Sequence, residues 1–314
     1  MHIVVPDDLT RSALELLRSE GWTVDATTGR TMTEVAASVV AADALIVRSA
    51  TRVTAALIAA APKLRVIARA GTGVDTIDLH AAAARNVVVM NAPAATTTSV
   101  SELAVAGMLA MARHVSAADR SMKDGHWDKA RFAGSELSGK TLGVVGCGRI
   151  GRAVARLGAA FGMQVVAHDP VLTAHDAAAL QVEVVSLEAL CQRADYISLH
   201  VPATSATRHL FDAARLATCV RGVRLVNTAR GELVDAEALL AALTSGHVAG
   251  AAIDVYDPEP PVSYALAAHP AVVATPHLAA STREAQERVS LEVAAAVRDF
   301  LKTGVARNAV GVSA

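Results

Sequence analysis

A glycine-rich turn near the middle of the chain constrains the fold more than any other stretch. Gly146, Gly148 and Gly151 have the spacing G-x-G-x-x-G and follow an apolar run that is typical of a buried strand. A helical pattern comes next, and a second apolar run then leads to Asp169. The N-terminus of a helix placed after such a turn presents unpaired N–H groups that suit a diphosphate. The stretch therefore predicts a βαβ unit that binds a dinucleotide.

Each residue type in this stretch has a physical reason. Gly146 allows the tight turn, Gly148 lets the backbone approach a pyrophosphate, and Gly151 lets the helix pack closely on the strand. Asp169 stands where a carboxylate accepts hydrogen bonds from an adenosine ribose, and it would repel a phosphate on that ribose. Glycine clusters also mark ordinary turns, but here the strand, helix, second strand and acid occur in order. The pattern favours NAD over NADP.

Composition excludes several classes of function. The chain has 314 residues, 53% of them hydrophobic, and a net charge of −1, which indicates a globular protein with room for two domains. This charge offers no basis for binding nucleic acid or an anionic membrane. The start lacks a signal-peptide pattern, and no apolar run has the length of a membrane span. Cys147, Cys191 and Cys219 are odd in number and lack metal-ligand spacing, so we expect a cytoplasmic protein without a metal.

Strands and helices alternate along the chain, which is the pattern of a parallel α/β fold. The first part contains apolar strand candidates at residues 3–5, 23–25, 44–47, 65–68 and 87–90. After the glycine turn and Asp169, further candidates lie at residues 182–185, 194–200, 224–227, 249–253 and 272–274. An amphipathic helix over residues 282–301 has no strand after it, so we expect it to pack on the first domain.

The connection between the two halves contains a break, a helix and an irregular segment. Residues 91–98 are a turn-rich candidate hinge, and Ser99-x-x-Glu102 has the spacing of a capping box. This box predicts a helix over about residues 101–115, which is apolar on most faces and so must be buried in the core or between subunits. Residues 121–139 lack a clear period, and they could form an arm over a partner subunit or a surface loop.

Polar and glycine-rich loops follow two strands of the first domain. Residues 48–51 follow the third strand, and residues 69–75, which include Gly71 and Gly73, follow the fourth. Ligands bind beyond the carboxyl ends of strands in open parallel sheets, and glycine permits a close approach to the ligand. Surface turns with solvated arginines are an equally good interpretation of these loops.

The second half places chemically useful residues after successive strands, which would bring them to one edge of a doubly wound sheet. The residues at these strand ends are Gly146, Asp169, Pro202, Arg230, Asp254 and His277.

Three residues near this edge suit acid–base chemistry on a carbonyl compound. His277 can exchange a proton near neutral pH, Glu259 can hold the tautomer of an imidazole, and Arg230 offers a fork that matches a carboxylate. Each also has a structural interpretation, since His269 also adjoins a proline, an arginine can form an ion pair, and a glutamate between prolines is usually exposed. Their convergence on the cofactor edge favours a catalytic role.

These residues resemble the D-isomer-specific 2-hydroxyacid dehydrogenases, most closely their phosphoglycerate dehydrogenase branch. The segments that carry the resemblance span nearly the whole chain: VRSATRVT, RAGTGVDTID, VVVMNAP, SMKDGHWDKARFAGSELSGKTLGVVGCGRIG, VNTARGELVD, AAIDVYDPEPP and TPHLAASTREAQ. The resemblance implies two similar doubly wound domains, with a Rossmann NAD-binding domain, residues 94–281, inserted in a flavodoxin-like substrate domain, residues 1–93 plus 282–314.

The resemblance also implies site residues. Arg230 would bind the substrate carboxylate, and His277 would exchange the proton with Glu259 as its partner. Arg149 and Ile150 would lie on the pyrophosphate and Asp254 near the nicotinamide, and the other implied cofactor contacts are Thr72, Gly146, Gly148, Gly151, Asp169, Val201, Pro202, Thr228, Ala229, Ala279 and Ala280. The implied substrate residues are Arg48, Ser49, Gly71, Gly73 and Arg131, of which Arg131 would come from a neighbouring subunit.

The implied function is NAD-dependent oxidation of 3-phospho-D-glycerate to 3-phosphohydroxypyruvate, in a homodimer joined through its NAD-binding domains. Residues 94–96 and Thr76 depart from the usual pattern of the phosphoglycerate branch. They therefore leave open another 2-hydroxy acid substrate, as in a glyoxylate or hydroxypyruvate reductase. An NAD-sensing binding protein of the corepressor type is a further alternative. We expect no feedback control through an appended serine-binding domain.

Overall fold

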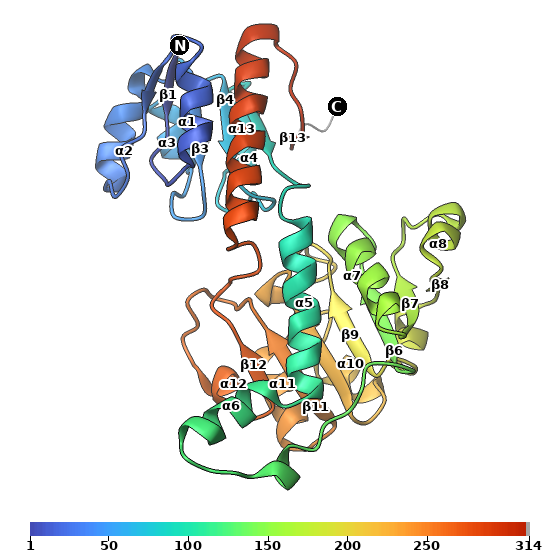
Figure 1. The fold of residues 1–314 in the computed structure, drawn as a ribbon. Helices are drawn as coiled ribbons and strands as arrows, with labels where there is room; N and C mark the ends of the chain where they lie inside the picture. The colour runs from blue at the N-terminus through green and yellow to red at the C-terminus, as the bar shows by residue number, and fades with distance from the viewer. Residues whose placement is uncertain (312–314) are drawn as a thin grey trace. The chain divides into compact units, whose positions relative to one another are not determined.

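The computed structural model describes residues 1–311, and the chain divides into two compact units. Unit 1 consists of Met1–Thr96 and the chain from Ser281 onward, and unit 2 consists of Thr97–Ala280. Each unit has one mainly parallel sheet with helices on both faces (Figure 1). The predicted α/β class with two doubly wound sheets is therefore confirmed. The assignment of residues 94–281 to NAD binding, and of residues 1–93 and 282–314 to substrate binding, stays a prediction.

The sheet of unit 1 has the order β13-β5-β4-β3-β1-β2, and its parallel strands follow the flavodoxin-like order. The added edge strand, β13, runs antiparallel to β5 and was not predicted, because two residues are too few to show a period. The bounds are β1 His2–Val4, β2 Thr23–Asp25, β3 Ala44–Val47, β4 Val66–Arg69, β5 Val88–Asn91 and β13 Ala309–Val310.

Alternating residues of these strands support two separate cores in unit 1. Ile46 of β3 packs with α1 and α13 on one face, whereas Leu45 and Val47 pack with α2, α3 and α4 on the other. The return of α13 to this unit confirms the expected packing of the last helix. The helix bounds are α1 Arg11–Arg18, α2 Met32–Ser38, η1 Val39–Ala41, α3 Ala55–Ala59, α4 Leu79–Ala84 and α13 Arg283–Thr303.

The sheet of unit 2 has the order β12-β11-β10-β9-β6-β7-β8, and its strand pairs are all parallel. Counted from β6, the first strands follow the 3-2-1-4-5-6 order of a Rossmann fold. The bounds are β6 Thr141–Val145, β7 Gln164–His168, β8 Glu183–Val184, β9 Tyr196–Leu199, β10 Val223–Asn227, β11 Val248–Ile253 and β12 Val272–Ala274.

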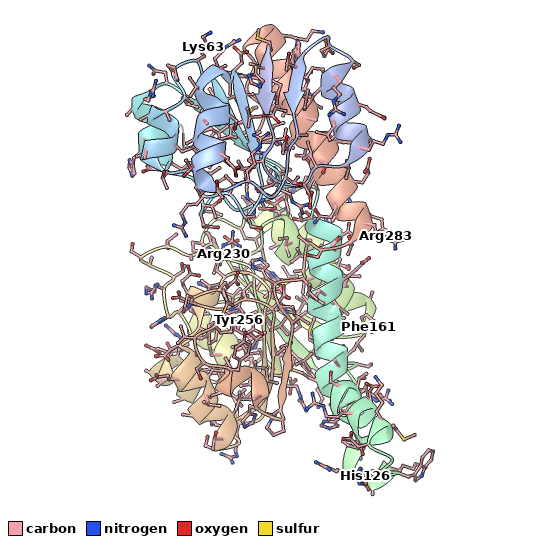
Figure 2. All side chains as sticks on the ribbon, turned by 90° about the vertical axis from the view of Figure 1, so that its left-hand side faces the viewer. Lys63, His126, Phe161, Arg230, Tyr256 and Arg283 are labelled. Carbon is pink, nitrogen blue, oxygen red and sulfur yellow. The ribbon has the colours of Figure 1, made fainter. Side chains whose placement is uncertain are left out.

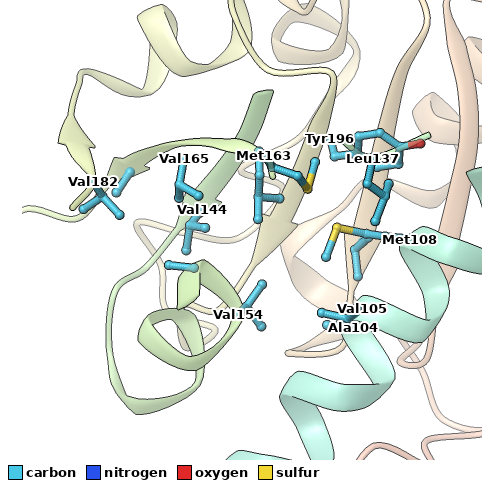
Figure 3. Packing of buried hydrophobic residues seen from close by; sticks show 14 of the residues in the cluster. Ala104, Val105, Met108, Leu137, Val144, Val154, Met163, Val165, Val182 and Tyr196 are labelled. Atoms are coloured by element: carbon cyan, nitrogen blue, oxygen red, sulfur yellow. The ribbon is translucent and has the colours of Figure 1, made fainter. Parts of the chain in front are cut away.

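Helices also cover both faces of this second sheet. Helices α5, α7 and α8 pack on one face, where Met108 and Val154 belong to the same buried cluster as Val144 of β6 (Figure 3). Helices α9, α10 and α11 pack on the other face, against Val145 and its neighbours. The bounds are α5 Thr97–Ala112, α6 Val115–Lys123, η2 Lys129–Phe132, α7 Arg149–Ala160, α8 Ala174–Leu180, α9 Leu187–Cys191, α10 Ala213–Thr218, η3 Gly231–Leu233, α11 Ala236–Thr244 and α12 Ala265–Ala268.

The start and end of α5 differ from the prediction. The helix begins at Thr97, so Ser99 and Glu102 lie inside it and the predicted capping box is wrong. The apolar pattern is nevertheless that of a buried helix, and α5 packs against α7 and β11 as expected. The helix ends at Ala112 rather than near residue 115, and His114 then takes a left-handed conformation with φ 54° before α6 begins.

The segment from α6 to η2 is the most exposed part of unit 2. Val115 and Met122 are each 54% exposed, and Trp127 is 80% exposed. Figure 2 shows His126 at the far end of this segment, well away from Arg230 of the same unit. In the part of the chain that the structure describes, no helix combines the length and the apolar character needed to cross a membrane.

Candidate active site

The carboxyl ends of the unit 2 strands gather the residues that the sequence predicted for one edge. Because β6, β7, β9, β10, β11 and β12 are mutually parallel, the loops after them leave the sheet on the same side. The predicted residues in these loops are Gly146, Asp169, Pro202, Arg230, Asp254 and His277. Parallel pairing alone therefore brings together side chains from more than a hundred residues of sequence.

The glycine turn fits a dinucleotide. Close contacts within the protein require glycine at two of its positions, and the third position faces open space. Gly146 has φ 90°, and an added Cβ would lie 2.7 Å from the His200 carbonyl oxygen. At Gly151 an added Cβ would lie 1.9 Å from the Gly146 oxygen. At Gly148 an added Cβ would meet nothing within 4 Å, so no neighbouring protein atom requires a glycine there. The free space lies at the N-terminus of α7, where Gly148 and Arg149 are exposed.

The carboxylate of Asp169 is fixed beside this turn. Its Oδ2 accepts the N–H of Cys147 at 2.6 Å, and its Oδ1 accepts the N–H of Val171 at 2.9 Å. Burial, together with the charge of Asp169, raises the pKa of Cys147 to about 11. The thiol is therefore protonated at neutral pH, which fits a small filler residue rather than a nucleophile.

His277 and Glu259 form a hydrogen-bonded pair. The Nδ1 of His277 lies 2.7 Å from Oε2 of Glu259, while Oε1 of Glu259 accepts the N–H of Tyr256 at 3.0 Å. The two side chains are 49% and 38% exposed, so a small molecule can reach the imidazole. Since Nδ1 faces the carboxylate, Nε2 is the nitrogen available for proton exchange.

Asp254 positions the backbone that carries His277. The residue is 1% exposed, and its carboxylate accepts the Thr275 hydroxyl and the N–H groups of Leu278 and Ala279 at 2.5, 2.7 and 2.9 Å. Its backbone oxygen also accepts the N–H of His277 at 2.8 Å, and His277 has the left-handed φ of 54°. A non-glycine residue in this conformation requires such support from its surroundings.

Asn227 holds the backbone around Arg230 by hydrogen bonds, as Asp254 does for His277. The sequence analysis did not predict Asn227 as a site residue. Its side-chain amide donates to the Arg230 carbonyl at 2.8 Å and accepts the N–H of Ala229 at 3.1 Å. Asn227 is 1% exposed at the end of β10. The available signal was a polar residue closing an apolar strand, next to a predicted site residue.

A close backbone approach joins the Arg230 loop to the Glu259 loop. An added Cβ at Gly231 would lie 2.1 Å from the carbonyl carbon of Tyr256, so only glycine fits there. Burial, reinforced by the nearby carboxylates of Asp254 and Glu259, raises the pKa of Tyr256. Its protonated hydroxyl donates to the carbonyls of Ile253 and Thr275.

The other predicted cofactor residues of unit 2 lie in the same group of loops. Thr228 is 8% exposed, and its hydroxyl oxygen is buried without a hydrogen-bond partner within residues 1–311. A buried hydroxyl in this state suits a polar ligand atom. The remaining predicted cofactor residues follow β9, β10 and β12, and they are Val201, Pro202, Ala229, Ala279 and Ala280.

A second histidine at this edge is unsuited to proton transfer. Burial lowers the pKa of His200 to about 4, and its Nε2 lies 2.8 Å from the Ser198 hydroxyl. His200 is therefore neutral at neutral pH, and His277 is the better candidate acid and base. Within residues 1–311 no three His, Cys, Asp or Glu groups cluster so as to hold a metal ion.

In unit 1 the predicted substrate loops also share a sheet edge. Arg48 follows β3, its backbone N–H donates to Asp7 Oδ2 at 2.5 Å, and its guanidinium contacts Gln286. Gly71, Thr72 and Gly73 follow β4, where the Thr72 carbonyl accepts the side-chain N–H of Asn91 at 2.6 Å. The loop residue Ser49 is exposed.

Thr96 and Arg131 are two further positions that the sequence analysis singled out. Thr96, in the stretch that departs from the family pattern, is buried with its hydroxyl 3.0 Å from that of Thr72. Arg131 lies on η2, where its guanidinium packs over Phe132, and this segment is remote from Arg230 within unit 2 (Figure 2). Arg131 is thus not part of the group formed by Arg230, Glu259 and His277 in one chain.

Comparison with known proteins relates this chain to one family of dehydrogenases. The model of the D-isomer specific 2-hydroxyacid dehydrogenase NAD binding domain matches residues 105–279. D-3-phosphoglycerate dehydrogenase from Rattus norvegicus is 45% identical over 300 residues, which cover 96% of this chain and 56% of the rat protein. The chain spans about half the length of the curated relatives that it matches.

Solved structures share the fold of this chain over nearly its whole length. The TT0316 protein from Thermus thermophilus has a TM-score of 0.91 and 38% identity, over 99% of this chain and 100% of that one. A glyoxylate reductase from Paecilomyes thermophila has a TM-score of 0.90 and 28% identity, over 99% and 98%. Residues 105–279 form the family's NAD-binding domain, and the chain belongs to the D-isomer specific 2-hydroxyacid dehydrogenases.

Proposed function

We propose that this chain oxidises 3-phospho-D-glycerate to 3-phosphohydroxypyruvate with NAD. The observation that carries the proposed chemistry is the pair of His277 and Glu259, whose side chains lie 2.7 Å apart at the dinucleotide edge of the sheet. The choice of substrate is supported by the 45% identity to a D-3-phosphoglycerate dehydrogenase.

In this proposal the chain's residues bind, orient and deprotonate the hydroxy acid. Arg230 pairs with the substrate carboxylate through its forked guanidinium. His277 takes the hydroxyl proton on Nε2, and Glu259 holds the tautomer that leaves this nitrogen unprotonated. Bound NAD supplies the acceptor for the C2 hydride.

We assign the cofactor residues by how well the surroundings of each one suit a part of NAD. The open space at Gly148 and the N–H groups at the start of α7 suit the pyrophosphate, and Asp169 suits the ribose hydroxyls. The buried hydroxyl of Thr228 suits a polar group of the nicotinamide half. Arg48, and Arg131 of a second subunit, are our proposed partners of the substrate phosphate.

We also propose that the protein is a homodimer and is cytoplasmic. The exposed apolar side chains of the segment from α6 to η2 support association with a second copy. Cys147, Cys191 and Cys219 are buried and free, which suits a reducing compartment.

The test compares substrates and two histidine variants. The wild type should oxidise 3-phospho-D-glycerate with NAD at a kcat/KM well above its values for glyoxylate and hydroxypyruvate with NADH. His277→Ala should lower kcat/KM by about a hundredfold to ten-thousandfold, the usual contribution of a general base. His269→Ala is the matched control, because His269 also adjoins a proline and its Nδ1 accepts the N–H of Ala271 in its own turn.

Three outcomes separate the alternatives. Near-normal turnover by His277→Ala would contradict the acid–base role. A preference for glyoxylate would favour the second candidate, a glyoxylate reductase, which the similarity to the Paecilomyes thermophila enzyme supports. Tight binding of NADH without turnover of any tested acid would indicate a sensor rather than an enzyme.

A further inference from the structure

A chain of polar contacts links the first turn of α8 to the dinucleotide turn. Asp176 Oδ2 accepts a guanidinium N–H of Arg152 at 2.8 Å, and Arg152 Nε donates to the Cys147 carbonyl at 2.9 Å. The N–H of Cys147 donates in turn to Asp169 at 2.6 Å. Asp176 is itself fixed, because its N–H donates to the N-cap hydroxyl of Thr173 at 3.1 Å.

The position of Arg152 creates a conflict in cofactor selection. Enzymes that bind NAD place a carboxylate at the ribose, as Asp169 does, whereas enzymes that bind NADP place an arginine nearby for the 2′-phosphate. This chain has both a carboxylate and an arginine at the turn. Arg152 donates a hydrogen bond to the carbonyl of Cys147, and the N–H of Cys147 donates to Asp169. An uncompensated Arg152 would therefore attract the phosphate that Asp169 repels.

The pairing with Asp176 removes this conflict. The side chains of Arg152 and Asp176 are 34% and 33% exposed, so neither is shielded from a bound nucleotide. The hydrogen bond to Arg152 lowers the pKa of Asp176, and the same bond raises the pKa of Arg152. Both groups are charged at neutral pH, and the pair is neutral as a whole.

We propose that Asp176 is a specificity-determining residue that favours NAD over NADP by neutralising Arg152 next to Asp169. It acts through Arg152 and is therefore a positioning residue, because it fixes the guanidinium that donates to the Cys147 carbonyl in the turn. This proposal rests on the NAD-dependent function proposed above, and it adds a determinant on α8 to the one at the end of β7.

The test measures direct binding of NADH and NADPH by the fluorescence of the reduced nicotinamide, without substrate. Asp176→Asn keeps the shape of the side chain and removes its charge. The Kd for NADPH should fall about fivefold to tenfold, as expected for one exposed cation near a phosphate, while the Kd for NADH should change less than about threefold. The gain should shrink in high salt, because the charges are exposed. Asp176→Glu should behave like the wild type.

A double variant makes the role of Arg152 explicit. Arg152→Gln combined with Asp176→Asn should return the ratio of the two Kd values to that of the wild type. An unchanged ratio in Asp176→Asn, or an equal loss of both nucleotides, would overturn the proposal and leave Asp176 with a structural role. Failure of the wild type to bind either nucleotide would contradict the NAD-dependent function and this proposal together. Nucleotide binding without turnover of any tested acid would contradict the proposed oxidation but leave this proposal standing.

Discussion

At the scale of single residues, buried polar side chains hold the loops of the candidate site through hydrogen bonds to the protein. Asp254 uses both carboxylate oxygens to hold the backbone from Thr275 to Ala279. Asn227 uses both ends of its amide to hold the turn before Arg230. Each anchors a loop at the end of a strand, and the exposed His277 and the half-buried Arg230 depend on these anchors for their positions.

Asp254→Asn should separate positioning from direct cofactor binding. The amide of Asn cannot accept the N–H of Ala279 on its nitrogen, so we expect a loss of about 1–3 kcal/mol of stability. A small displacement of His277 should lower kcat by about tenfold or more, with the KM for NAD nearly unchanged. Chemical denaturation and steady-state kinetics measure the two effects.

Asp257→Asn is the control for this variant. Asp257 lies on the same stretch of chain but pairs with Arg208 at 3.1 Å in an exposed position, where a pair contributes little. A rise in the KM for NAD with kcat unchanged in Asp254→Asn would instead indicate that Asp254 binds the cofactor directly.

At the scale of elements, the strand–turn–helix from β6 to α7 has glycines with different tasks. Gly146 and Gly151 are required by contacts within the protein, at 2.7 Å and 1.9 Å from an added Cβ. Gly148 has φ −68° and ψ −163°, which other residues adopt readily, and open space around it. One element therefore contains two glycines that the fold needs and a third, Gly148, that we propose is needed by the bound dinucleotide.

Alanine substitutions should distinguish these tasks. Gly151→Ala should cost about 3 kcal/mol or more, because the new methyl group would overlap the Gly146 carbonyl. Gly148→Ala should change stability by less than about 0.5 kcal/mol, as for a surface substitution, yet raise the Kd for NADH about tenfold or more. Thermal unfolding and NADH titration give the two readouts, and an equal loss of stability in both variants would contradict the assignment.

At the scale of the whole molecule, two units of the same α/β class share one chain. Unit 1 is completed by α13, whose Val293 and Val297 pack against the first strands although nearly two hundred residues of unit 2 intervene. Unit 2 contains the exposed segment from α6 to η2, which presents the apolar side chains of Val115, Met122 and Trp127. We expect this segment to contact a second copy.

Substitutions in this segment should weaken the proposed dimer. Trp127→Ser combined with Met122→Ser removes two exposed apolar side chains, and the dimer Kd should rise about thirtyfold or more, as expected for an interface hot spot. Val262→Ser is the control, because Val262 is 88% exposed outside this segment. Sedimentation over a range of concentrations measures the Kd, and a wild type that is monomeric at micromolar concentration would contradict the dimer.

The sequence by itself determined the local features of this protein. The G-x-G-x-x-G spacing and the apolar runs predicted the parallel strands and the dinucleotide turn, because side-chain periodicity and glycine conformations are local properties. The polar residues after those runs predicted Arg230, Glu259 and His277 as candidate site residues. The sequence misplaced the start of α5, since Ser99 has the chemistry of a cap but lies in a helix that buried packing extends to Thr97.

Only the tertiary structure decided which distant groups meet. Asp254 beneath the His277 loop, Gly231 against Tyr256 and Asp176 on Arg152 are contacts between segments whose separation in sequence gives no sign of them. They depend on the order of strands in the sheet and on how closely neighbouring loops pack. Short-range patterns do not encode these quantities, because both arise from the packing of the whole unit.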